Sequence, residues 1–293
     1  MGSITDPFSS VDFSDLPPLA TFTARDGTKL AYRPYASAAA TPGQQGSVVL
    51  VHGSSATSSS MHPMAKACSA AGYSTFALDI RGHGASGRKG QIAYIGQLED
   101  DLADFIHAVS PPPPVTLAGF SSGGGFAIRF AGSKQQSLFQ SYLFLAPFLS
   151  PDAPTTRPGS GGWASVGLPR IIAIATLNGF GIRTFNSLPV LRFAISGNAK
   201  AILTPEYSYA LTVNFGPQRD YLADLRNMHQ PFRVLVGAND EVYYPDRFAG
   251  VLKQAGKDTP VTMVPGVDHI QLTLSPVAFE TSIEALKSLR SNH

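Results

Sequence analysis

Three residue types that together perform nucleophilic catalysis occur along this chain in the order Ser121, Asp240 and His269. A serine hydroxyl attacks a carbonyl carbon only when a base removes its proton, and a carboxylate orients that base. Ser121 is the centre of the pentapeptide Gly119-Phe120-Ser121-Ser122-Gly123, a Gly-x-Ser-x-Gly pattern. This pattern holds the serine on a sharp strand-to-helix turn. We therefore predict Ser121 as nucleophile, His269 as general base and Asp240 as the acid that orients it.

The three residues each follow an apolar run that reads as a strand. Ser121 follows residues 115–118, Asp240 follows 234–239, and His269 comes shortly after 261–264. The carboxyl ends of parallel strands meet at one edge of a sheet, where ligands gather. We expect the three side chains at that edge, with Glu241 and Asp246 left open as alternative acids.

The negative oxygen of a tetrahedral intermediate needs hydrogen-bond donors. Two backbone amides are placed to supply them: that of Ser122, directly after the nucleophile, and that of Ser54, in the loop after the strand 46–51. His52 in the same loop reads first as structural support. The expected substrate contacts around this site are His52, Ser55, Phe120, Phe148 and Trp163.

Strand and helix patterns alternate along most of the chain. Residues 21–32 read as a β-hairpin with an Asp26-Gly27 turn. Buried strands are expected at 46–51, 75–80, 115–118, 142–146, 232–237 and 261–264, and helices at 60–71, 94–109, 124–131, 246–255 and 276–290. Such alternation predicts an α/β fold with a mostly parallel central sheet and helices on both faces.

The alternation of strand and helix patterns is interrupted between residues 149 and 229. Proline- and glycine-rich loops are followed there by apolar pieces at 163–177 and 188–195, which read as helices. We expect an N-terminal extension at 1–20, a core formed by 21–148 and 230–293, and an apolar helical cap or lid at 149–229. Binding sites for small molecules are mostly apolar, so the cap predicts an acyl-chain pocket.

Several segments together carry a family resemblance. They are Val51-His52-Gly53, Asp79-Ile80-Arg81-Gly82-His83-Gly84-Ala85-Ser86, Gly119-Phe120-Ser121-Ser122-Gly123-Gly124, Gly237-Ala238-Asn239-Asp240 and Asp268-His269. In type and order they resemble the α/β-hydrolase superfamily, especially the branch of serine esterases similar to lysophospholipases and monoacylglycerol lipases. The resemblance covers residues 20–290, with 149–229 only loosely matched. Phe120 and Ser122 depart from it, because that branch usually has histidine and methionine or glutamine there.

This resemblance implies a cofactor-free serine hydrolase that cleaves carboxylic esters with a lipophilic acyl or alcohol part through an acyl-enzyme. Three alternatives stay open. They are a serine hydrolase of another bond (an aminopeptidase or a carbon–carbon hydrolase), a cofactor-free haloperoxidase, and a catalytically silent ligand-binding protein. An aminopeptidase needs acids to hold an ammonium group, and segment 149–229 offers only Asp152, Glu206, Asp220 and Asp224.

Composition limits the partners. Charged residues make up 14% of the chain and the net charge is +2, which gives no basis for nucleic-acid binding. Cys68 is the only cysteine, so neither an intrachain disulfide nor a metal site built on cysteine pairs is expected. Residues 1–20 lack the pattern of a secretory signal, and the lipophilic stretch 168–180 is too short to span a bilayer. We expect a cytoplasmic protein without metal or cofactor, acting on a small-molecule ester, with transient contact to a lipid interface through the cap.

Overall fold

A mostly parallel sheet forms the centre of the computed structural model, which describes residues 6–39, 45–159, 162, 164–195 and 199–290. Its strand order within these residues is β1-β2-β4-β3-β5-β6-β10-β11. The strands are β1 (Ala20–Thr23), β2 (Lys29–Tyr35), β3 (Ser47–Val51), β4 (Ser74–Leu78), β5 (Val115–Phe120), β6 (Ser141–Leu145), β10 (Phe232–Gly237) and β11 (Val261–Val264). β1 and β2 pair antiparallel as the expected hairpin, β2 also joins β4 antiparallel, and the remaining pairs are parallel.

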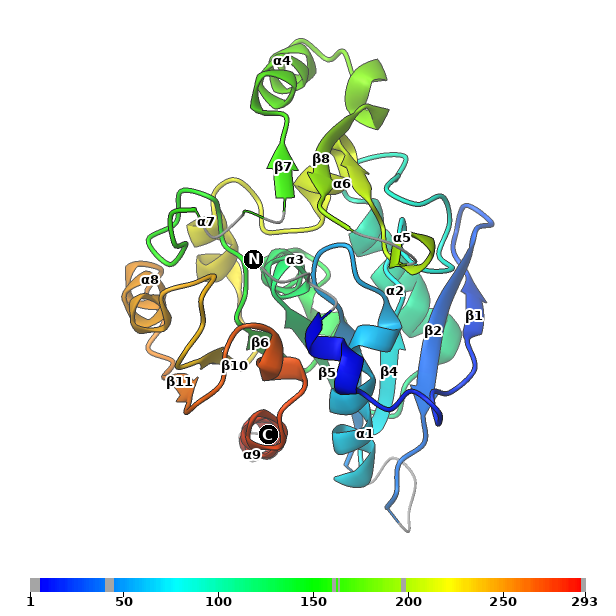
Figure 1. Ribbon diagram of the computed structural model, residues 1–293, viewed down its shortest axis with the longest axis vertical. Coiled ribbons are helices and arrows are strands. Elements are labelled where there is room, and N and C mark those ends of the chain that lie inside the picture. Colours follow the sequence, from blue (N-terminus) through cyan, green and yellow to red (C-terminus); the bar gives the residue numbers. More distant parts are fainter. Residues whose placement is uncertain (1–5, 40–44, 160–161, 163, 196–198, 291–293) are drawn as a thin grey trace.

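The central strands are buried along their whole length because helices cover both faces of the sheet. Every residue of β3, β5 and β6 is buried. The main helices of the core are α1 (His62–Ala70), α2 (Gln97–Val109), α3 (Ser122–Ala131), α8 (Phe248–Gln254) and α9 (Pro276–Arg290). Helices α1 and α9 pack together on one face, and α2 and α3 lie on the other (Figure 1). The expected α/β fold is confirmed.

The strand register brings three loops to one edge of the sheet. Val51, at the end of β3, pairs with Gly119 of β5, and Phe120 pairs with Leu145 of β6. Leu145 in turn pairs with Leu235, two residues before the end of β10. The neighbouring strands β3, β5, β6 and β10 therefore end at the same edge of the sheet, and the residues that follow β3, β5 and β10 gather there.

Segment 149–229, which we call the cap segment, contains a small antiparallel sheet as well as helices. Its elements are β7 (Ala164–Val166), α4 (Leu168–Gly179), η4 (Thr184–Ser187), β8 (Pro189–Phe193), α5 (Ala199–Ile202), β9 (Glu206–Ser208), α6 (Tyr209–Asn214) and α7 (Tyr221–Asn227). The helix predicted at 188–195 is wrong, because β8 runs through it and pairs with β7 and β9. Val190 and Phe193 are buried there, and both residue types favour strands.

Helix α4 stands at the far end of the cap segment, away from the central sheet (Figure 1). Within α4 only Ile174 is fully buried. Leu168 and Ile172 are each 58% exposed, and Phe180, just after the helix, is 79% exposed. This part of the cap segment thus presents apolar side chains to solvent. In the part of the chain that the structure describes, no helix has both the length and the apolarity needed to cross a bilayer.

Candidate active site

Ser121 occupies a sharp turn between β5 and α3. Its backbone angles are φ 55° and ψ −118°, a conformation that residues with a Cβ seldom adopt. The turn requires glycine on both sides. A Cβ on Gly119 would lie 2.2 Å from the carbonyl oxygen of Gly123, and a Cβ on Gly123 would lie 2.3 Å from that of His52. The local sequence therefore explains how the serine is held at the carboxyl edge of the sheet.

His269 connects Ser121 with Asp240. Its Nε2 lies 3.1 Å from the Ser121 Oγ, and its Nδ1 lies 2.8 Å from the Asp240 Oδ2. The other carboxylate oxygen of Asp240 accepts the backbone N–H groups of Val242 and Tyr243, at 2.8 and 2.7 Å. A carboxylate on Nδ1 keeps the proton on that nitrogen, which leaves Nε2 as the acceptor that faces the serine.

The other acids near His269 make different contacts. Glu241 accepts the backbone N–H of His269 through Oε2, at 3.0 Å. Asp268 accepts the backbone N–H of Gln271, at 2.8 Å. Asp246 lies in the short turn η5 (Pro245–Arg247). Among these candidates, Asp240 is the carboxylate that contacts the imidazole ring.

The two residues whose amides are predicted to hold an oxyanion, Ser54 and Ser122, lie beside each other. The hydroxyl groups of Ser54 and Ser122 form a hydrogen bond that joins the loop after β3 to the start of α3. Among the described residues, the backbone N–H groups of Ser54 and Ser122 have no hydrogen-bond acceptor. The first N–H groups of a helix have no intrahelical partner, and a negative oxygen is a suitable acceptor for them. The arrangement can therefore stabilise an oxyanion next to Ser121.

Two of the residues expected to contact substrate lie next to the serine. The ring of Phe120 packs on that of His269, with centroids 4.8 Å apart. Phe148 is partly buried, and its backbone N–H donates to the Ser121 carbonyl oxygen at 2.9 Å. Trp163 lies outside the described residues.

The other two, His52 and Ser55, face the protein interior. His52 is fully buried; its Nδ1 contacts the Gly53 carbonyl at 2.8 Å, and its Nε2 accepts the Ile80 N–H at 3.3 Å. Ser55 is also fully buried, and its hydroxyl donates to the carbonyl of Thr204, at 2.7 Å. Both side chains therefore hold the loop after β3 and have no free polar atom for a substrate.

Tyr243 is a site residue that the sequence reading missed. It is 4% exposed, and its ring meets that of His269 edge-on, with centroids 5.2 Å apart. Burial raises the pKa of the Tyr243 phenol, and a hydrogen bond with the Ser121 side chain opposes that shift. The only sequence signal for Tyr243 is its place three residues after Asp240.

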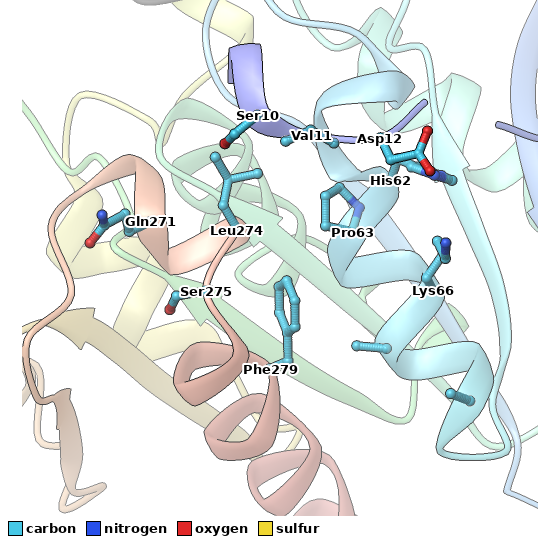
Figure 2. Close-up of a pocket in the computed structure, with 12 residues that line it drawn as sticks. Ser10, Val11, Asp12, His62, Pro63, Lys66, Gln271, Leu274, Ser275 and Phe279 are labelled. Carbon is cyan, nitrogen blue, oxygen red and sulfur yellow. The ribbon is translucent and has the colours of Figure 1, made fainter. Parts of the chain in front are cut away.

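A cavity of about 830 Å³ lies elsewhere, between the N-terminal residues and helices α1 and α9. Figure 2 shows Val11, His62, Leu274 and Phe279 around it. None of Ser121, Asp240 and His269 lines this cavity, so it is separate from the candidate active site. Among the described residues, no group of three or more His, Cys, Asp or Glu side chains is arranged to hold a metal ion.

Comparison with known proteins gives two sequence matches, each to part of the chain. Residues 42–178 match the model of the family described as Serine aminopeptidase, S33. A monoacylglycerol lipase from Mycolicibacterium smegmatis is 31% identical over 109 residues. That match covers 35% of this chain and spans 38% of the relative's length.

Solved structures share the fold of most of the chain. A soluble variant of monoglyceride lipase from Saccharomyces cerevisiae superposes with a TM-score of 0.68 at 20% identity, covering 94% of this chain and 95% of that one. A putative aryl esterase from Burkholderia cenocepacia gives a TM-score of 0.65 at 18% identity, covering 94% and 100%. The protein thus has the α/β-hydrolase fold, and the resemblance to the monoacylglycerol-lipase-like branch is confirmed.

Proposed function

We propose that the protein is a serine hydrolase that cleaves carboxylic esters with a lipophilic acyl or alcohol part. The observation that carries this proposal is the hydrogen-bonded chain from the Ser121 Oγ through His269 to Asp240. An activated serine beside two unpaired backbone N–H groups is the arrangement that acyl transfer requires. The relatives named above are lipases and esterases, which supports an ester over another acyl bond.

The geometry allows each step to be assigned to an atom. The Ser121 Oγ attacks the carbonyl carbon while the Nε2 of His269 takes its proton. The amides of Ser54 and Ser122 hold the negative oxygen of the tetrahedral intermediate. When that intermediate collapses, His269 protonates the departing alcohol oxygen and an acyl-Ser121 remains. Water, deprotonated by His269, then attacks the acyl carbon, and the carboxylic acid leaves as the serine regains its proton.

The lipophilic preference rests on the apolar surroundings of the site and on the cap segment. Phe120 covers the imidazole of His269, and the exposed side chains Leu168, Ile172 and Phe180 lie on or next to α4. Apolar surface of this kind marks contact with lipid or protein. We infer that the cap segment meets a lipid interface transiently while the substrate enters.

An aminopeptidase is less well supported, although the matching family carries that name. It would need a free carboxylate for the substrate ammonium, and three acids of the cap segment are engaged elsewhere. Glu206 pairs with Arg192, Asp220 caps α7, and Asp224 accepts the backbone N–H of Gln218. The ester hydrolase is therefore the function that the contacts favour.

The test is hydrolysis of p-nitrophenyl esters from acetate to palmitate by the natural protein and by Ser121→Ala. We expect measurable turnover that falls by at least about 10³-fold in the variant, with a chain-length optimum that sizes the acyl pocket. Ser282→Ala is the matched control, because Ser282 is a buried serine of α9. Equal turnover by the natural protein and Ser121→Ala would contradict the proposal. So would tight binding of apolar ligands without product release, which would favour a silent binding protein.

A further inference from the structure

The loop that bears the Ser54 amide is anchored to the cap segment through the next residue, Ser55. Ser55 is fully buried and has φ 65°, a left-handed conformation that a non-glycine residue keeps only when its surroundings impose it. Its backbone N–H donates to the Tyr207 hydroxyl, and its own hydroxyl donates to the Thr204 carbonyl at 2.7 Å. Its carbonyl accepts the Thr204 N–H at 2.9 Å. All three polar groups of Ser55 are thus satisfied by residues 204–207.

Tyr207 is itself held in a single orientation. The Nδ1 of His83 faces the carbonyl oxygens of Ile80 and Arg81, at 3.2 and 3.3 Å, so this nitrogen carries the proton. Its Nε2 then accepts the hydroxyl hydrogen of Tyr207, at 2.6 Å, and the tyrosine oxygen is left to accept the Ser55 N–H. Burial lowers the pKa of His83, which keeps the ring neutral and able to accept.

The surroundings of Tyr207 leave its ring no other position. It is 2% exposed and packs edge-on against the rings of Phe193, at 4.8 Å, and His83, at 5.1 Å. Beside it, the Thr204 hydroxyl donates to the Gly82 carbonyl at 3.1 Å, and the Ser208 N–H donates to the Gly90 carbonyl at 2.8 Å. Residues 204–208 therefore form hydrogen bonds with the loop between β4 and α2 as well as with the loop after β3 that contains Ser55.

We propose that Tyr207 is a positioning residue for the oxyanion loop, so that residues 204–208 of the cap segment are a fixed part of the catalytic apparatus. The inference rests on the proposed function. The peptide group that joins Ser54 to Ser55 is anchored by the tyrosine oxygen, and this fixes the direction of the neighbouring Ser54 N–H. Any opening of the cap segment then takes place in residues other than 204–208.

The decisive variant is Tyr207→Phe, which keeps the ring and removes the hydroxyl. The kcat for p-nitrophenyl butyrate is measured per active site, counted by titration with an organophosphate that labels Ser121. We expect kcat to fall by about 10- to 100-fold while KM stays within about twofold, because the loss is confined to the oxyanion. Affinity for a trifluoromethyl ketone, whose adduct carries an oxyanion, should fall by the same factor as kcat/KM.

The matched control is Tyr142→Phe. Tyr142 is also fully buried, its hydroxyl donates to the Gln136 carbonyl at 2.6 Å, and it lies outside the site. Removing the Tyr142 hydroxyl should lower the stability of the protein and leave kcat per active site unchanged. A Tyr207→Phe protein with kcat within twofold of the natural value would overturn the inference and leave the proposed function intact. A natural protein that neither hydrolyses esters nor reacts at Ser121 would overturn both.

Ser55→Ala provides a milder second variant, should Tyr207→Phe not fold. It removes the bond to the Thr204 carbonyl and keeps the backbone anchors. We expect kcat to fall by about threefold or more with KM unchanged. If kcat per active site is unaffected by Ser55→Ala, the anchoring of this loop has no role in the reaction and the inference fails.

Discussion

The guanidinium Nε of Arg157 donates hydrogen bonds to the backbone carbonyl oxygens of Asp240, at 3.0 Å, and Tyr243, at 2.8 Å. Arg157 belongs to the cap segment, whereas Asp240 follows β10 of the core. The guanidinium also lies over the ring of Tyr244, 4.2 Å from its centroid, and Thr156 forms an isolated antiparallel bridge with Tyr243. The start of the cap segment thus holds the backbone of the loop that carries the acid.

Replacing this arginine should therefore weaken catalysis without touching the reacting groups. In Arg157→Lys we expect kcat for a small soluble ester to fall about tenfold with little change in KM, because lysine lacks the Nε–H that reaches both carbonyls and the planar guanidinium that lies over Tyr244. Arg192→Lys is the control, since Arg192 is an exposed arginine of the cap segment paired with Glu206. Equal kcat values for the two variants would show that the Asp240 loop does not depend on Arg157.

Asp240→Asn tests the choice of acid. The amide can keep the contact with His269 but favours the wrong tautomer of the ring, so we expect kcat to fall on the order of 10³- to 10⁴-fold. Glu241→Gln should cost less than about tenfold, because a glutamine oxygen still accepts the His269 N–H that Glu241 binds at 3.0 Å. Single-turnover kinetics of acylation compare the two. A larger loss in Glu241→Gln would transfer the orienting role to that residue.

Two glycine substitutions should change stability in opposite directions. In Gly123→Ala the new Cβ would meet the His52 carbonyl oxygen at 2.3 Å, so unfolding free energy should fall by about 3 kcal/mol or more. Gly250 lies within helix α8, where a new Cβ would meet no atom within 4 Å, and Gly250→Ala should add about 0.5–1 kcal/mol. Urea unfolding midpoints measure both. Similar midpoints for the two variants would contradict the crowding at the serine turn.

Asp224 makes stability depend on pH. It is 2% exposed, and burial raises its pKa from the ordinary 3.8 to about 6. Between pH 4 and 6 the folded protein binds a proton at Asp224 that the unfolded chain has lost. Protonation of Asp224 therefore stabilises the folded protein fully below about pH 4, and this stabilisation is lost as pH rises through about 6. Asp224→Asn keeps an oxygen for the Gln218 N–H. It should be more stable than the natural protein at pH 7–8, by at most about 3 kcal/mol.

Urea midpoints of both proteins from pH 4 to 8 check this. The advantage of Asp224→Asn should shrink to near zero toward pH 4, where the natural aspartate is protonated in the folded and, increasingly, in the unfolded state. A difference that stays constant over the whole range would mean that the Asp224 carboxyl does not titrate differently on folding.

Most of the core could be predicted from the sequence because its strands and turns depend on residues that are close together in the chain. Buried runs such as 115–118 and 232–237 formed strands, and the glycines around Ser121 indicated the turn that the structure shows. The cap segment was harder to read, since β8 depends on pairing with β7 and β9 and not on its own pattern.

The contacts that arrange the site were missed for a related reason. Tyr207 reaches Ser55 across 152 residues, and Arg157 reaches the Asp240 carbonyl across 83. Neither residue stands in a motif, and a tyrosine or an arginine in an apolar segment reads as ordinary packing or surface. Such contacts follow from how the cap segment lies on the core, which no local spacing encodes.

Ser121 keeps its hydroxyl in place at a φ of 55°, where glycine would sit with less strain. In a duplicated gene whose product was no longer needed for hydrolysis, a change from serine to glycine at this position would gain stability and cost the cell nothing. The stability of the fold alone thus favours glycine over serine at position 121. The proposed reaction, and not the stability of the fold, is what requires a serine at this turn.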